Sequence, residues 1–214
     1  MTNDYWAEAF EGIEREILLM HLGLFEQYRN IIEDFLEGES FQKAREELGI
    51  RRQVDPETPI FKEQEDLLDF EEVGYFADVL RRSFFISLYE FLEFKLKEEC
   101  RYRQRKKDDV LLSVSDISGS GLNRVKIYFT KVLRIDFPAN STEWGKINGG
   151  YRQLRNCIIH KGSKVAESEK SLRGFIEREP GLSLHSDSGT VIIHKEFCKE
   201  VLDTVEKFVW LLPF

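Results

Sequence analysis

Residues 154–162, Leu-Arg-Asn-Cys-Ile-Ile-His-Lys-Gly, form the last part of a helical pattern in this chain. Upstream, apolar side chains recur at steps of three and four residues, as on the packed face of an amphipathic helix: Trp144, Ile147, Tyr151, Leu154 and Ile158. Ser141 or Thr142 is placed to cap the start of this helix. The pattern therefore puts Arg155, Asn156 and His160 close together near a helix end.

Arg155 and His160 are suited to phosphate chemistry. An arginine always carries its charge and a histidine titrates near neutrality, so the pair can bind a phosphate and move a proton without a metal. Asn156 lies four residues before His160 on the same helix face, where a hydrogen bond would orient the imidazole. Arg155 lies five residues before His160, about 140° away around an ideal helix. A distorted helix end, or a second copy across a two-fold axis, would bring both side chains to one phosphate.

Two glycines, Gly149-Gly150, lie inside the same helical pattern. Each glycine weakens a helix by ~1 kcal/mol relative to alanine. We expect the pair to allow either the close approach of another helix or a bend.

A long helix is predicted near the N-terminus, over residues 5–37. No proline interrupts it, and Gly38 is a natural stop. Its apolar residues recur with helical spacing: Trp6, Phe10, Ile13, Ile17, Leu24, Tyr28, Ile31 and Phe35. A short helix at 41–48 and a linker containing prolines follow, and a second long helix is predicted over 61–101, with a bend near Gly74.

The C-terminal half is predicted to hold shorter elements. Helices are expected at 122–133 and 167–177, followed by a β-hairpin at 182–194 around an Asp/Ser/Gly turn. The last helix, 195–212, is expected to bury one apolar face: Phe197, Val201, Leu202, Val205, Phe208 and Val209. Long helices joined by short links indicate an all-α, antiparallel, bundle-like fold.

Charge is distributed unevenly along the chain. Residues 1–100 hold 11 Lys/Arg against 25 Asp/Glu, whereas residues 101–173, which include the Arg155 segment, hold 16 against 7. Net acidity disfavours general nucleic-acid binding, but a local basic field draws a polyanion. Two interpretations of the basic run at 101–107 stay open: it complements the helix dipole at a C-terminus, or it also contacts nucleic acid through Arg103, Arg105, Lys106 and Lys107.

Several classes of protein are disfavoured by the sequence. No apolar run reaches the roughly 20 residues that span a bilayer, and the N-terminus lacks a signal-peptide pattern. Three isolated cysteines suit a reduced cytoplasm better than a disulfide framework. The histidines show no zinc-ligand spacing, so neither a metal nor a cofactor is expected. Glu90 and Glu93 can face the Arg155 site, but carboxylates paired on a helix are usually solvated, and we assign them no catalytic role.

Arg155-Asn156 followed after three residues by His160 is an instance of an Arg-x4–6-His motif with a polar residue after the arginine. It resembles the motif of the HEPN (higher eukaryotes and prokaryotes nucleotide-binding) superfamily. The surrounding order is similar too: a preceding long helix, a helix with Tyr128-Phe129, Trp144 before the motif, and a C-terminal helix. The resemblance covers about residues 69–212. It implies a HEPN-like domain at 69–214 and an N-terminal helical extension at 1–68 that packs on it as one compact unit.

The resemblance also implies an activity. Many members are metal-independent, often dimeric endoribonucleases of toxin–antitoxin or anti-phage systems. On this chain His160 would transfer a proton and Arg155 would hold the scissile phosphate, with Asn156 and Lys161 in support, leaving 2′,3′-cyclic phosphate ends. RNA, a second copy and an antitoxin or defence protein are the implied partners, in the cytoplasm and without a membrane.

One position departs from the family. HEPN toxins paired with a nucleotidyltransferase antitoxin carry a modified tyrosine two residues after the histidine, where this chain has Gly162. Some members have lost activity and serve as RNA-binding or dimerisation modules. A structural role also stays open, in which Arg155 pairs with a carboxylate of the acidic half and His160 is an ordinary helix-end residue.

Overall fold

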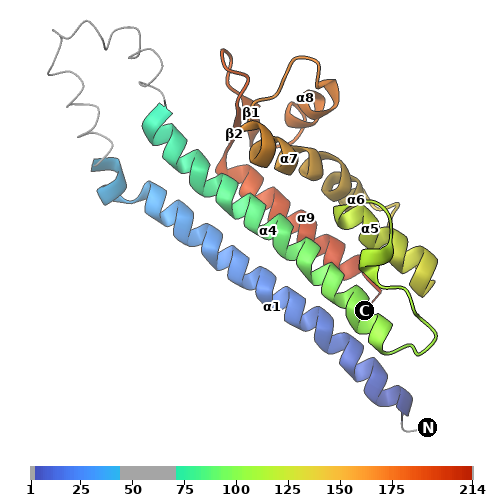
Figure 1. Cartoon of the computed structure of the whole chain (residues 1–214). Coiled ribbons are helices and arrows are strands. Elements are labelled where there is room, and N and C mark those ends of the chain that lie inside the picture. The colour runs from blue at the N-terminus through green and yellow to red at the C-terminus, as the bar shows by residue number, and fades with distance from the viewer. Residues whose placement is uncertain (1–2, 44–70, 214) are drawn as a thin grey trace, which may run out of the picture.

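The computed structural model describes residues 3–43 and 71–213 (Figure 1). Within these ranges the chain is mostly helical, and its strands form one small hairpin. The predicted all-α class with a hairpin before the last helix is therefore confirmed. The predicted linker, the second half of the short helix at 41–48, the start of the second long helix and the domain boundary at residue 68 lie outside the described residues.

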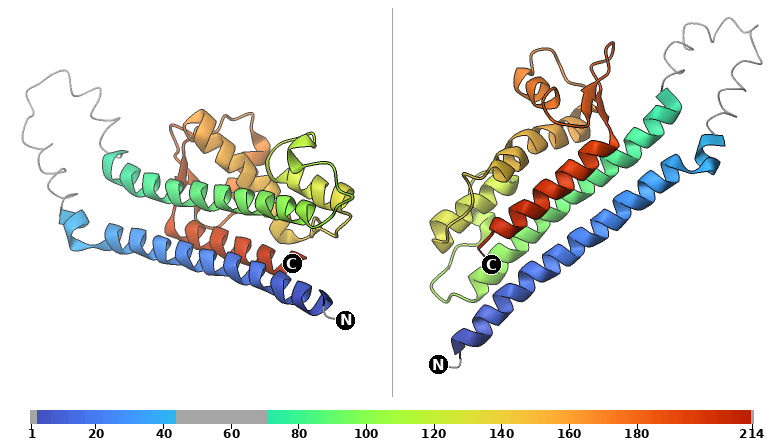
Figure 2. Two further views of the ribbon diagram at one scale, coloured as in Figure 1. Left: turned by 60° about the horizontal axis from the view of Figure 1, so that its bottom comes forward. Right: turned by 180° about the vertical axis from the view of Figure 1, so that it is seen from behind.

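Three long helices lie side by side (Figures 1 and 2): α1 (Asn3–Glu37), α4 (Glu71–Arg105) and α9 (Lys195–Leu211). α1 runs antiparallel to the other two and packs against both. α4 continues without a break through Gly74. The predicted packed face of α9 is confirmed, because all six of its apolar residues are buried: Phe197, Val201, Leu202, Val205, Phe208 and Val209.

α1 has two apolar faces, and only one of them packs in the core. The positions that identified this helix include five exposed side chains: Ile17, Leu24, Tyr28, Ile31 and Phe35. The core instead receives a face rotated by about 100°: Leu18, Leu22, Ile32 and Leu36. Apolar spacing located the helix correctly but did not reveal which face meets α4 and α9, because that depends on residues distant in sequence.

A second layer covers the other side of α4 and α9, and it contains the helix that carries the Arg155 segment. That helix runs in three consecutive pieces: α6 (Thr142–Gly145), a π-helical turn η3 (Lys146–Tyr151) and α7 (Arg152–Lys161). Ser141 caps its start, since the Trp144 backbone N–H donates to the Ser141 hydroxyl at 3.1 Å. Before it come α5 (Gly121–Ile127) and a second π-helical turn η2 (Tyr128–Leu133).

The π-helical turn η3 holds this helix against its neighbours. A Cβ on Gly150 would lie 2.2 Å from the Phe175 ring, so glycine allows α8 (Lys170–Ile176) to approach closely, which is one of the two outcomes expected of the glycine pair. Tyr151 is buried, and its hydroxyl donates to Glu179 at 3.0 Å and shares a hydrogen bond with the Thr204 hydroxyl at 3.2 Å. Burial raises the pKa of this phenol, which keeps it neutral. These contacts fix the N-terminal half of the helix.

The predicted hairpin is formed by β1 (Leu182–Leu184) and β2 (Val191–Ile193), which pair antiparallel. Two charged residues of α4 bind the backbone of β2. Asp78 accepts from the Ile193 N–H at 2.9 Å, and Arg82 donates to the Val191 carbonyl at 2.8 Å. Burial raises the pKa of the Asp78 carboxyl although Arg82 is its ion-pair partner. The hairpin is therefore joined to the long helices at the end of the molecule where α4 begins.

No helix in the described ranges has the combination of length and apolar character that a membrane span requires.

Candidate functional site

Arg155, Asn156, His160 and Lys161 all lie on α7, which is a regular α-helix from Arg152 to Lys161. The π-helical turn lies before Arg155, and the helix ends at Gly162 in the left-handed conformation (φ 56°). No distortion therefore falls between Arg155 and His160. The angular offset of about 140° expected of an ideal helix between these two side chains is retained.

The Arg155 guanidinium is held by two acceptors. Its Nε donates to Glu90 Oε1 of α4 at 2.8 Å, and its Nη2 forms an ion pair with the same oxygen. Its Nη1 donates to Asn156 Oδ1 at 3.1 Å. The Arg155 side chain is 25% exposed and that of Glu90 is 46% exposed, so water and solutes reach the pair. An exposed pair of this kind contributes only about 0–1 kcal/mol to stability.

Glu90 is the site residue that sequence reasoning did not assign. It is 65 residues from Arg155, so only the packing of α4 against α7 brings them together. The structure also separates Glu90 from Glu93, whose carboxylate pairs with Lys97 and lies beside Gly121. A carboxylate of the acidic half does bind Arg155, as the structural alternative anticipated.

His160 is exposed in the last turn of α7 and makes no hydrogen bond to the described part of the chain. The predicted contact between Asn156 and His160 does not form, and the Asn156 oxygen accepts from Arg155. Asn156 therefore orients the arginine rather than the imidazole.

Lys161 pairs with Glu169, whose other oxygen accepts from the Ala166 N–H at 3.0 Å. The hydrogen bond from Lys161 lowers the pKa of the Glu169 carboxyl and raises that of the lysine. This contact ties the end of α7 to the loop before α8. The Lys161 side chain remains 51% exposed, so its charge still contributes to the surface around His160.

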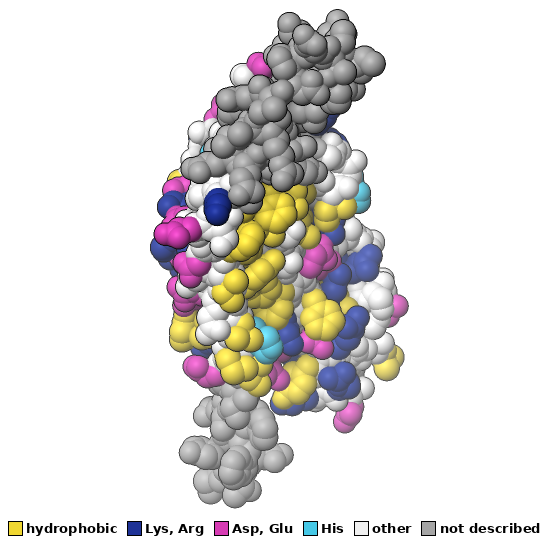
Figure 3. All heavy atoms as spheres, turned by 90° about the vertical axis from the view of Figure 1, so that its left-hand side faces the viewer, with side chains coloured by type: hydrophobic (Ala, Val, Ile, Leu, Met, Phe, Trp, Pro, Cys, Tyr) yellow, Lys and Arg dark blue, Asp and Glu magenta, His cyan; other side chains and the backbone are white. Residues whose placement is uncertain are grey.

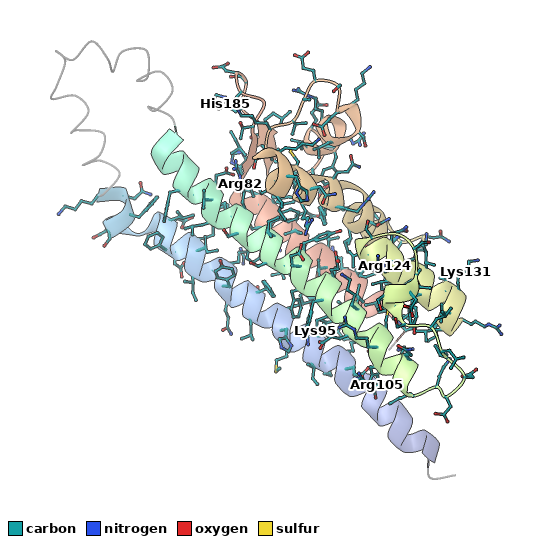
Figure 4. The ribbon with its side chains drawn as sticks, viewed as in Figure 1. Arg82, Lys95, Arg105, Arg124, Lys131 and His185 are labelled. Carbon is teal, nitrogen blue, oxygen red and sulfur yellow. The ribbon has the colours of Figure 1, made fainter. Side chains whose placement is uncertain are left out.

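In the basic run at the end of α4, some cations are anchored, which means that they contact other parts of the protein, and others are open, which means that they are exposed without such a contact. Arg103 pairs with Glu99, donates to the Pro213 carbonyl and lies over the Phe129 ring at 5.6 Å, so it has structural contacts on three sides. Lys106 lies over the Tyr102 ring at 4.2 Å, and Lys107 donates to the Leu133 carbonyl at 3.3 Å. Arg105 is exposed at the end of α4 near α1 (Figure 4). Among the four cations proposed to contact nucleic acid, Arg105 is therefore the one without a described anchoring contact, although Glu14, Glu98 and Glu99 line the same depression.

Within the described residues, no three His, Cys, Asp or Glu side chains gather into a group able to hold a metal ion. His194 and Ser183 hydrogen-bond at 2.9 Å, and His21 lies against the Phe91 ring at 5.5 Å. Cys100, Cys157 and Cys198 are free and buried. The side chains available for chemistry in this region are therefore those of α7 and Glu90.

Comparison of the chain with protein-family models, curated proteins and solved structures gave no match.

Proposed function

We propose that the protein is a metal-independent endoribonuclease of the HEPN type that acts as a toxin or anti-phage defence effector. The observation that carries the proposal is the geometry of Arg155. Its guanidinium is partly exposed and already binds a carboxylate, and the exposed His160 follows five residues later on the same helix. A phosphate, like a carboxylate, presents two anionic oxygens that a guanidinium can bind in a bidentate manner, so RNA can replace Glu90 at Arg155.

In this proposal Arg155 binds the scissile phosphate and stabilises the charge that builds on it. His160 accepts the 2′-hydroxyl proton or protonates the 5′-oxygen leaving group, which yields a 2′,3′-cyclic phosphate and a 5′-hydroxyl. Asn156 holds the guanidinium, and Lys161 adds positive charge beside the RNA. Because α7 is regular between Arg155 and His160, the two side chains of one helix lie about 140° apart, so either the bound RNA spans both of them or another copy supplies one of the pair.

A second candidate is a HEPN-like RNA-binding or dimerisation module without catalysis. Two observations favour it. All three nitrogens of the Arg155 guanidinium have a hydrogen-bond partner, and His160 lacks an orienting hydrogen bond to the described residues. Catalytic histidines are usually held in one tautomer by such a bond.

An RNA cleavage assay in EDTA separates the two candidates. The nuclease proposal expects purified protein to cut RNA with cyclic-phosphate ends, and expects Arg155→Ala and His160→Ala each to abolish cutting. Arg152→Ala is the matched control, because Arg152 is an exposed arginine on the same helix, bonded to the Asn148 carbonyl. RNA binding without cleavage in any variant assigns the module instead. Cleavage that needs Mg²⁺, or that survives both substitutions, contradicts the nuclease.

A further inference from the structure

The outer face of α1 carries a continuous row of exposed apolar side chains. This row, called the α1 stripe here, repeats at steps of three and four residues: Ile17, Met20, Leu24, Tyr28, Ile31 and Phe35. Their exposed fractions lie between 37% and 66%. A stripe with this spacing stays on one side of a helix for five turns, which is about 27 Å. Figure 3 shows hydrophobic side chains gathered in a band along this side of the molecule.

α4 extends the same apolar surface. Phe76 is 43% exposed and its ring lies 6.2 Å from that of Phe35. Phe94 is 53% exposed and eighteen residues further along, which is five full turns, so it projects from the same side of α4. Tyr28 in the middle of the stripe contacts the Phe84 ring of α4 at 5.8 Å. The surface therefore spans two adjacent antiparallel helices.

The size of this surface exceeds what a monomer normally exposes. At roughly 200 Å² for a fully exposed side chain of this size, the eight exposed fractions amount to about 800 Å² per copy. The largest apolar patch on a typical monomer is about 300–600 Å². Each partner in an interface of standard size buries about 800 Å², so pairing of two such surfaces gives a stable dimer.

The order of residues in the stripe identifies a second copy as the partner. An isologous interface must be complementary to itself after a two-fold rotation. When α1 is paired antiparallel with another α1 about a centre between Leu24 and Tyr28, Leu24 meets Tyr28 of the other copy and Ile17 meets Phe35. Each aromatic side chain then faces an aliphatic one, so large and small residues interlock as in a packed core.

The contribution of α4 agrees with the same two-fold axis. α1 and α4 are antiparallel, with Phe76 beside Phe35 and the α4 residue Phe91 beside His21. Phe94, one turn beyond Phe91, is therefore level with the N-terminal end of the stripe. The rotation brings the Phe94 end of one copy to the Phe76 end of the other, so the two exposed phenylalanines cover each other.

We infer that two copies of this chain pair through the α1 stripe and the adjacent face of α4, with their α1 helices antiparallel. This surface lies on the side of α4 and α9 that faces away from α7, so the pairing leaves the two Arg155 segments apart, and the inference does not rest on the proposed nuclease. Leu24 lies next to the centre of the seam and Ile31 lies between the centre and Phe35, so a buried, unpaired charge at either position opposes association.

Light scattering on the purified full chain tests the pairing. The wild type is expected at about twice its 25.2 kDa chain mass at micromolar concentration, and Leu24→Glu and Ile31→Glu at the monomer mass. Leu111→Glu is the matched control, because Leu111 is 90% exposed in the loop after α4, outside the stripe, and this variant is expected to stay dimeric. Circular dichroism checks that each variant keeps its helices.

Cysteine crosslinking tests the orientation. A short bis-maleimide is expected to join two copies of the double variant Ile17→Cys/Phe35→Cys, whereas either single variant stays uncrosslinked because its two sites lie about 27 Å apart along the seam. The three native cysteines are buried, so the maleimide is not expected to react with them. A monomeric wild type, a dimeric Leu24→Glu variant, or crosslinking of the single Ile17→Cys variant overturns the inference. A monomer that binds a different protein through the stripe overturns it as well.

Discussion

The two halves of the helix from Thr142 to Lys161 differ in how their side chains are held. In the first half Ile147, Gly150 and Tyr151 are buried, and the Tyr151 hydroxyl bonds to Glu179 and Thr204 inside the protein. In the second half Leu154 and Cys157 are also buried, but Arg155 is partly exposed, His160 is exposed, and the partner of Arg155 is a surface carboxylate. The buried residues of both halves therefore fix the helix in place, and the outer face of the second half presents polar groups whose loss is expected to leave the fold intact.

The largest effect on stability is expected at Tyr151. Tyr151→Ala removes a ring packed against Phe85, Phe175 and Phe197, and such deletions reduce the free energy of unfolding by about 3–5 kcal/mol. His160→Ala on the exposed half is expected to change it by less than about 0.5 kcal/mol. Urea denaturation of both variants measures the contrast. Equal losses at the two positions would contradict the distinction between the buried Tyr151 and the exposed His160.

The glycine pair in the π-helical turn gives the next contrast. Gly150→Ala places a methyl group within 2.2–2.5 Å of the Phe175 ring, so overpacking is expected to destabilise the protein by about 1–3 kcal/mol. A Cβ at Gly149 meets nothing within 4 Å, so Gly149→Ala is expected to be neutral or stabilising by up to about 1 kcal/mol. Thermal melting of the two variants measures the difference. A Gly150→Ala protein as stable as Gly149→Ala would show that α8 is not held against the turn.

A smaller effect on stability is expected at Glu90, the α4 residue that binds Arg155. Glu90→Gln removes the charge that competes with phosphate for Arg155, while the amide oxygen still accepts a hydrogen bond. RNA binding at constant salt is expected to tighten several-fold, with a change in unfolding free energy within about 1 kcal/mol, as for an exposed ion pair. Fluorescence anisotropy with labelled RNA measures the affinity. Weaker binding by this variant would assign Glu90 a role in presenting Arg155 to RNA rather than competing for it.

The smallest effect is expected from substitutions at the end of α4, where Arg103 is anchored by contacts with other residues and Arg105 is open to solvent. Arg105→Gln is expected to reduce the slope of RNA affinity against salt by about one unit, since one phosphate contact is lost. Arg103→Gln is expected to lower the melting temperature, because Arg103 bonds to Glu99 and to the Pro213 carbonyl. An unchanged salt slope for Arg105→Gln would leave the basic run with only its role at the helix C-terminus.

Local sequence patterns predicted most of the elements of this fold. The spacing of apolar residues located α1, α9 and the helix that ends at Lys161, and the Asp/Ser/Gly turn located the hairpin. Ser141 was one of two predicted caps and is the residue that accepts the Trp144 N–H. These features depend on residues within about one helical turn of each other, so the sequence contains the information directly.

Features that depend on distant residues were not predictable in the same way. Two apolar faces of α1 have helical spacing, and only contact with α4 and α9 decides which one is buried. The Arg155–Glu90 pair joins residues on helices far apart in the chain, and it redirects Asn156 from His160 to Arg155. The π-helical turn around Gly150 forms where Phe175 packs against it. Motif spacing therefore located the candidate site but not its partners.

The most direct test of the proposed site compares three variants that differ little in expected stability: Arg155→Ala, His160→Ala and Arg152→Ala. Single-turnover cleavage of RNA in EDTA is measured for each, together with its melting temperature. The proposal predicts a loss of at least about 100-fold for Arg155→Ala and His160→Ala, the range expected for a phosphate-stabilising group or a general acid–base. It predicts near wild-type cleavage for Arg152→Ala, with similar melting temperatures throughout. Equal activity of the three variants, or an inactive wild type that still binds RNA, would contradict catalysis by Arg155 and His160.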